Sequence, residues 1–197
     1  AIVYSITFVT IMPFIRIYTQ GITDINYDIP FIGFLFVLNG FLYNIITPQG
    51  MLVKAAGHFR ETRIQTTVQA LILLLIGSFL APKFGLVGIL IGACLSNLYR
   101  VIDLFIYVPK KLTSLPIKST IIKLLNTVIK IFIICFPIQF IGFNPVNFLK
   151  WIFFATIVGV YGIIVACIYS LLFERKYFFS VIDRFKITFS KKTVRDK

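Results

Sequence analysis

The feature that most constrains this chain is a succession of six apolar runs separated by short polar connections. The predicted runs are 1–15, 30–46, 66–80, 85–108, 121–141 and 148–173. A helix needs about 20 mostly apolar residues to cross the hydrocarbon core of a bilayer. Hydrophobic residues make up 58% of the chain, and its mean hydropathy is +0.94, whereas a soluble domain is about 45–50% apolar. The sequence therefore predicts an all-α integral membrane protein with six transmembrane helices.

Basic residues are distributed unevenly among the connections between these runs. Of the 20 Lys and Arg residues, 15 lie in the second, fourth and sixth connections, and only three lie in the others. The second connection includes the stretch "LVKAAGHFRETRIQ" at 52–65. Because positively charged connections stay on the cytoplasmic side, this stretch and the C-terminus are predicted to be cytoplasmic. Orientation accounts for the net charge of +13, so nucleic-acid binding is not expected.

The two ends of the chain differ in character. Residues 1–173 are predicted to form the membrane bundle, and residues 174–197 a basic cytoplasmic tail. The first run has no basic flank or cleavage site of a signal peptide, which predicts a truncated first helix in the C-terminal part of a longer protein. In the tail, Phe178, Ile182, Phe185 and Phe189 share one helical face. The tail is predicted to lie as an amphipathic helix on an anionic leaflet, with a solvated, partly disordered tail as the alternative.

The fourth run contains a stripe of small residues followed by two charges. Gly88, Gly92 and Ser96 are spaced by four, so they share a helix face that allows close approach of a neighbouring helix in lipid. Arg100 continues this stripe, and Asp103 lies three residues further on. Because charges inside a membrane are costly and often functional, Arg100 is predicted to face the bundle interior and to have a functional role there. The alternatives are a structural Arg100–Asp103 pair and snorkelling of Arg100 to the cytoplasmic surface.

The fifth run carries a second polar face. Lys123, Asn126, Thr127 and Lys130 share this face through steps of three, four and seven residues. The pattern is typical of the wall of a water-filled cavity that opens to the cytoplasm. Alternatively, both lysines snorkel to lipid headgroups and report only the orientation of the helix. Pro137 is expected to kink this helix, because proline lacks an N–H.

The chain offers no pattern of residues typical of an enzyme or of a metal site. Asp24 and Asp28 could act as a carboxylate pair, but the simpler interpretation of both is loop hydrogen bonding. His58 is the sole histidine. The three cysteines match no zinc or redox motif and are predicted to be buried structural thiols: Cys94, Cys135 and Cys167. No metal or cofactor is expected.

Several stretches together resemble a known family. "PFIRIYTQGITDINY" follows a membrane helix, "AAGHFRETR" lies in a cytoplasmic connection, and "KFGLVGILIGACLSNLYR" leads into "PKK". These stretches resemble the flippases for lipid-linked oligosaccharides, which are the O-antigen, capsule and teichoic-type polysaccharide transporters of the multidrug/oligosaccharidyl-lipid/polysaccharide exporter superfamily. The resemblance implies about 12 to 14 helices in two pseudosymmetric lobes around a cavity with alternating access. This chain would be the C-terminal lobe.

The resemblance also implies a substrate and a location. The substrate would be a polyprenyl-pyrophosphate-linked oligosaccharide in a bacterial cytoplasmic membrane, and the partners would be membrane lipids and the N-terminal lobe of the same chain. Arginine suits a pyrophosphate because its planar fork donates two hydrogen bonds at once. The residues assigned to the anionic substrate are Lys54, Arg60, Arg63, Arg100 and Lys130.

Two other functions remain open at this point. A cation-coupled exporter of drugs or metabolites with the same fold would be expected to carry more acidic residues within its helices, where only Asp103 is found. A membrane protein that binds partners without transporting anything is the third hypothesis. A hydrophobic half encoded upstream would argue against it.

Overall fold

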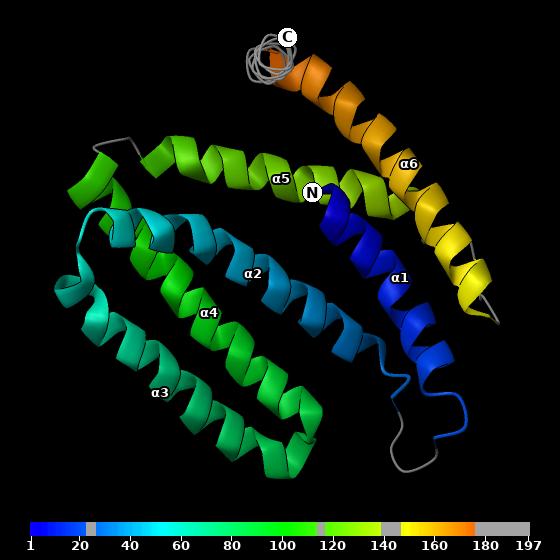
Figure 1. Cartoon of the computed structure of the whole chain (residues 1–197), viewed down its shortest axis with the longest axis horizontal. Helices are drawn as coiled ribbons and strands as arrows, with labels where there is room; N and C mark the ends of the chain where they lie inside the picture. The colour runs from blue at the N-terminus through cyan, green and yellow to red at the C-terminus, as the bar shows by residue number, and fades with distance from the viewer. Residues whose placement is uncertain (23–26, 114–116, 139–146, 176–197) are drawn as a thin grey trace, which may run out of the picture.

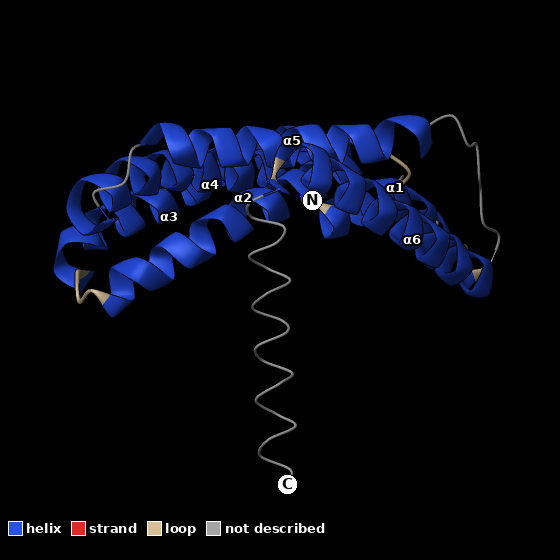
Figure 2. Cartoon of the chain, turned by 90° about the horizontal axis from the view of Figure 1, so that it is seen from above, coloured by secondary structure: helices blue, strands red, loops and turns tan. Residues whose placement is uncertain are grey.

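The computed structural model describes residues 1–22, 27–113, 117–138 and 147–175. Within these ranges the chain is helical apart from short turns (Figures 1 and 2). The six α-helices are α1 (Ile2–Tyr18), α2 (Pro30–Ala55), α3 (Phe59–Phe84), α4 (Leu86–Val108), α5 (Ile117–Ile138) and α6 (Phe148–Phe173). A π-helical turn, η1 (Pro109–Thr113), follows α4 directly. The predicted all-α class is therefore confirmed.

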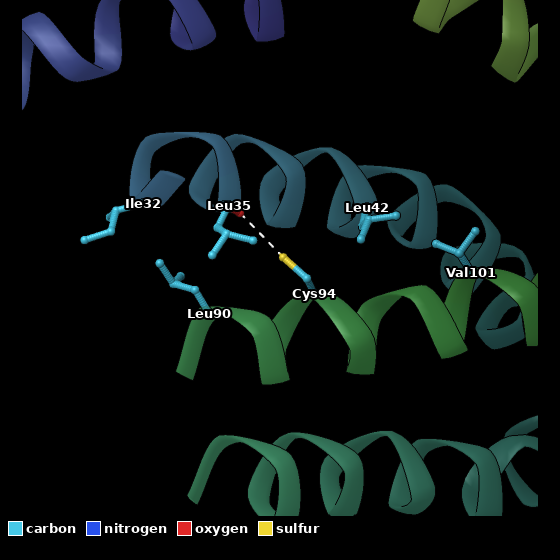
Figure 3. Close-up of a cluster of buried hydrophobic side chains, with 6 residues drawn as sticks. All are labelled: Ile32, Leu35, Leu42, Leu90, Cys94 and Val101. Atoms are coloured by element: carbon cyan, nitrogen blue, oxygen red, sulfur yellow. Dashed lines mark hydrogen bonds between the residues drawn. The ribbon is translucent and has the colours of Figure 1, made fainter. Parts of the chain in front are cut away.

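The helices form two groups that meet through α1 and α2. In the first group, α4 packs between α2 and α3. Buried side chains join α2 to α4, including Leu35 and Leu90, and the Cys94 thiol donates a hydrogen bond of 3.6 Å to the Leu35 carbonyl (Figure 3). In the second group, α1 packs against α5 and α6, around a core that includes Ile134 and Val158. Each group thus has a buried core of its own.

Five of the described helical segments are long and apolar enough to cross a membrane: 30–55, 59–84, 86–113, 120–138 and 148–173. The first helix, α1, is apolar but has only 17 residues. The many exposed Phe, Leu and Ile side chains on these helices are suited to a lipid environment, where water is absent and backbone hydrogen bonds must be satisfied within the helix. The chain accordingly has the architecture of a multi-pass membrane protein.

The second helix is longer than the sequence predicted. It was expected to end near 46 because Pro48 follows, but α2 continues through Pro48 to Ala55. Proline removes one N–H from the helix ladder, yet helices in membranes tolerate it where neighbouring groups take over the freed carbonyls. The carbonyl that Pro48 frees is that of Asn44, and the hydroxyl of the neighbouring Thr47 bonds the preceding carbonyl, of Tyr43, at 2.9 Å. The prediction that this helix ends near residue 46 was wrong.

The third helix begins earlier than the sequence predicted. It was expected to start near 66, but α3 starts at Phe59 and so absorbs most of the polar connection. Three threonine hydroxyls in this segment bond carbonyls one turn back in the chain. Thr62 bonds His58, Thr66 bonds Thr62, and Thr67 bonds Arg63, at 3.0–3.1 Å. A polar segment therefore satisfies its hydroxyl groups without leaving the helix.

The other predictions about single segments have mixed outcomes. The fourth and sixth runs agree with α4 and α6 to within one residue, whereas α5 begins four residues before the predicted position. Cys94 and Cys135 are buried as predicted, but Cys167 is exposed on α6, so that part of the prediction was wrong. The predicted tail helix, with Phe178, Ile182, Phe185 and Phe189, lies outside the described residues.

Candidate functional site

A basic hollow lies between the ends of α2, α3 and α4 that meet near His58. Its volume is about 560 Å³, which falls within the usual range for ligand sites. Three cations line it, one from each helix: Lys54 from α2, Arg63 from α3 and Arg100 from α4. Its remaining lining is Gly50, Val53, Phe59, Thr62, Thr66, Thr67 and Ala70. Three of the five cations expected to meet an anionic substrate are thus brought together.

The turn between α2 and α3 sets the position of two of these cations. Gly57 adopts a positive φ of 75°, a conformation that glycine reaches without steric cost, and its N–H bonds the Lys54 carbonyl at 3.0 Å. His58 Nδ1 lies 2.8 Å from the Tyr107 hydroxyl near the end of α4. This contact ties the turn to α4, so Lys54 and Arg63 face the same hollow as Arg100.

Arg100 is the most buried of the three cations. Its side chain is 8% exposed, and its Nη1 donates a hydrogen bond of 2.8 Å to Asp103 Oδ2, whose side chain is 18% exposed. The pair corresponds to the structural interpretation considered from the sequence, but Arg100 also lines the hollow. Asp103 therefore holds the guanidinium in one orientation, while Arg100 contributes positive charge to the hollow.

The other two candidate cations do not line the hollow. Arg60 is exposed at the start of α3. Lys130 lies on α5, and its Nζ is 2.6 Å from Glu174 Oε2 and 5.2 Å from the centre of the Tyr169 ring. Asn126 donates a further hydrogen bond of 3.1 Å to Glu174. The pKa of the Glu174 carboxyl group is lowered, and the main cause is the hydrogen bond from Lys130. Lys130 thus fastens α5 to the end of α6.

The stripe of small residues on α4 lies against α3. A Cβ atom on Gly88 would come within 2.5 Å of the Leu80 backbone, and one on Gly92 within 2.7 Å of the Gly77 nitrogen. Ser96 completes the stripe by donating a hydrogen bond of 2.7 Å to the Gln69 carbonyl. Arg63 and Arg100, which come from these two closely packed helices, line the same hollow.

The acidic residues of the first connection occupy a different part of the bundle. Asp28 forms an ion pair with Arg16 at 2.8 Å, between the end of α1 and the start of α2, and about half of each side chain is exposed. Asp24 lies outside the described residues. In the described part of the chain, no group of three or more His, Cys, Asp or Glu side chains could hold a metal ion.

Sequence reasoning missed an amide cluster beside the basic hollow. Asn97 on α4 donates a hydrogen bond of 2.8 Å to Asn39 on α2 and accepts one of 3.0 Å from Gln69 on α3. The three residues are far apart in sequence, so no spacing rule links them. The available signal was that each is an uncharged amide within an apolar run, where a polar group needs a partner.

The site combines an anion-attracting hollow with membrane-spanning helices. Three cations from three helices can bind a phosphate or carboxylate group, and the hydroxyl groups of the threonines can add hydrogen bonds. No protein-family model, curated protein or solved structure matches the chain. The inference about function therefore depends on this geometry and on the resemblance of its sequence motifs.

Proposed function

We propose that this chain forms one lobe of a transporter that moves a polyprenyl-pyrophosphate-linked oligosaccharide across the membrane by alternating access. The observation that carries the proposal is the basic hollow, in which Lys54, Arg63 and Arg100 converge at one end of the bundle. A pyrophosphate joined to a lipid presents multiple negative charges at the membrane surface, which is where these cations would meet it.

The hollow suits a pyrophosphate better than a small cation or a neutral drug. Its charged lining residues are all cations, and Asp103, the nearest acid on α4, is already paired with Arg100. The arginines present planar forks that bind phosphate oxygens in pairs, and the lysine adds a mobile point charge. A lipid chain attached to the pyrophosphate would remain beside the exposed apolar surfaces of the helices.

The proposal is tested by measuring the dissociation constant of a short-chain prenyl pyrophosphate for the purified chain in detergent micelles. Because a hydrogen bond to a charged group contributes about 1.5–3 kcal/mol, Arg63→Ala is expected to weaken binding by about tenfold or more. Arg60→Ala is the matched control, since Arg60 lies three residues away on the same helix but does not line the hollow. Arg60→Ala is expected to leave binding nearly unchanged.

A comparison with the corresponding prenyl alcohol, which lacks the pyrophosphate, separates binding of the pyrophosphate group from binding of the lipid chain. The alcohol is expected to bind far more weakly than the prenyl pyrophosphate and to be insensitive to Arg63→Ala. Equal affinity for the alcohol and the pyrophosphate, or equal effects of Arg60→Ala and Arg63→Ala, would contradict the proposed function.

A further inference from the structure

The amide cluster of Asn39, Gln69 and Asn97 has hydrogen-bonding capacity that the other described residues do not use. Asn97 occupies the middle, with its amide group bonded to both of the others. Within the described part of the chain, the amide nitrogen of Asn39 donates no hydrogen bond and the amide oxygen of Gln69 accepts none. The cluster therefore ends in an unused donor group at one side and an unused acceptor at the other.

These unused groups line a second hollow of about 370 Å³ that adjoins the first. Its lining includes all three amides and Ser96. Thr66 and Ala70 on α3 belong to the lining of both hollows. The two hollows therefore form one furrow along α3, with cations at one end and uncharged amides at the other.

We propose that the amide cluster is a second subsite, which binds the hydroxyl and amide groups of the sugar that is attached to the pyrophosphate. This inference rests on the proposed function, because the basic hollow must hold the pyrophosphate for the adjoining sugar to reach the cluster. Asn39 and Gln69 contact the sugar, and Asn97 is a positioning residue that holds both amides in place.

The chemistry of the cluster matches a sugar better than it matches a lipid tail or an ion. A sugar hydroxyl both donates and accepts hydrogen bonds, so it can accept from the Asn39 amide nitrogen and donate to the Gln69 amide oxygen. A furrow that held an acyl or prenyl chain would gain nothing from amides, because polar groups that lose water without a partner are costly.

The order of the two subsites predicts how far a ligand extends. In a lipid-linked oligosaccharide the pyrophosphate is bonded directly to the first sugar, so the anionic and hydroxyl-bearing parts are adjacent. The two hollows are also adjacent, because Thr66 and Ala70 line both of them. A volume of about 370 Å³ accommodates a small number of sugar units rather than a long polysaccharide.

The test compares two probes on the full chain in detergent micelles: a short-chain prenyl pyrophosphate, and the same lipid carrying an N-acetylhexosamine disaccharide. The native chain is expected to bind the glycosylated probe about tenfold more tightly. Asn39→Leu and Gln69→Leu should each reduce that ratio by about five- to tenfold, the size expected for one or two hydrogen bonds. Affinity for the unglycosylated probe should be unchanged, which also shows that each variant is folded.

The matched control is Asn44→Leu on the same helix. Asn44 is exposed, and its amide bonds the Gly40 carbonyl within α2, so this variant should keep the ratio of the native chain.

A native ratio near one, with tight binding of the unglycosylated probe, would overturn this inference and leave the proposed function intact. Loss of both affinities in Asn39→Leu and Gln69→Leu alike would assign the cluster to helix packing, and would also overturn it. Failure of the native chain to bind either probe would overturn both proposals.

Discussion

At the scale of single residues, the pair formed by Arg100 and Asp103 has two roles. The two charges lie 2.8 Å apart, and both side chains are largely shielded from solvent. A buried ion pair adds little net stability, but removing one partner leaves an uncompensated charge and costs about 3–5 kcal/mol. Arg100 is thus required for stability in the presence of Asp103, and its contribution to ligand binding must be separated from that requirement.

Arg100→Ala is expected to lower the free energy of unfolding by about 3–5 kcal/mol, because it leaves the Asp103 carboxylate without its cation. The double variant Arg100→Ala with Asp103→Ala should recover most of that stability, because neither charge remains. If Arg100 also binds the pyrophosphate, the double variant should still bind the prenyl pyrophosphate at least tenfold more weakly than the native chain. Denaturation in mixed micelles and a binding titration measure the two effects separately.

The exposed pair between Arg16 and Asp28 is the control for this experiment. Because about half of each side chain is exposed, Arg16→Ala should cost no more than about 1 kcal/mol and should not change binding. Recovery of native affinity in the double variant would assign Arg100 to a structural role alone.

At the scale of elements, the hairpin of α3 and α4 depends on backbone contact. Gly85 makes the turn with a φ of 56°, and the Gly88 and Gly92 faces then meet α3. Helices in lipid have little hydrophobic drive to associate, so their association depends on van der Waals packing. Glycines at the contact allow the two backbones to approach closely enough for that packing. The width of the furrow along α3 follows from this packing.

Gly92→Ala is expected to destabilise the chain by about 1–3 kcal/mol, the usual cost of overpacking. Its Cβ would lie 2.7 Å from the Gly77 nitrogen, a backbone atom that cannot move without moving α3. Gly77→Ala is the control from the same contact, since its Cβ would have no atom within 4 Å. It should be neutral or slightly stabilising, because alanine favours helix over glycine. Equal unfolding midpoints for the two variants would contradict this packing.

At the scale of the whole molecule, two of the described basic segments lie at the same end of the bundle. The contact between His58 and Tyr107 joins the turn after α2 to the end of α4, where Lys110 and Lys111 follow in η1. The connection with the Arg16–Asp28 pair joins the opposite ends of α1 and α2. Within the described residues, these basic segments are thus separated in space from the connection that carries Asp28.

Labelling of single cysteines with a membrane-impermeant maleimide tests the orientation that this charge separation predicts. By the positive-inside rule, Glu61→Cys should react only after the membrane of expressing cells is permeabilised, whereas Ile22→Cys should react in intact cells. Both positions are exposed. The native chain is the background control, since Cys94 and Cys135 are buried and Cys167 lies within α6. Reaction of Glu61→Cys in intact cells would reverse the assignment.

Much of the fold was predictable because membrane helices are specified locally. Long apolar runs predict spans whatever their neighbours are, and the runs that became α4 and α6 were placed to within one residue. The errors occurred where local propensity was overridden: Pro48 did not end α2, and the threonine-rich segment joined α3. In the second of these places, threonine hydroxyl groups bond carbonyls one turn back, so the polar segment satisfies its hydroxyls within the helix.

By itself, the sequence determined the helical class, the approximate spans and the alternation of charge, because each depends on composition within a single run or connection. Only the tertiary structure decided which polar residues share a site. It placed Lys54, Arg63 and Arg100 in one hollow and fastened Lys130 to Glu174 elsewhere. It also joined Asn39, Gln69 and Asn97 across three helices. The physical reason is that such sites depend on helix rotation and on which helices are neighbours, and both are set by packing between segments distant in sequence.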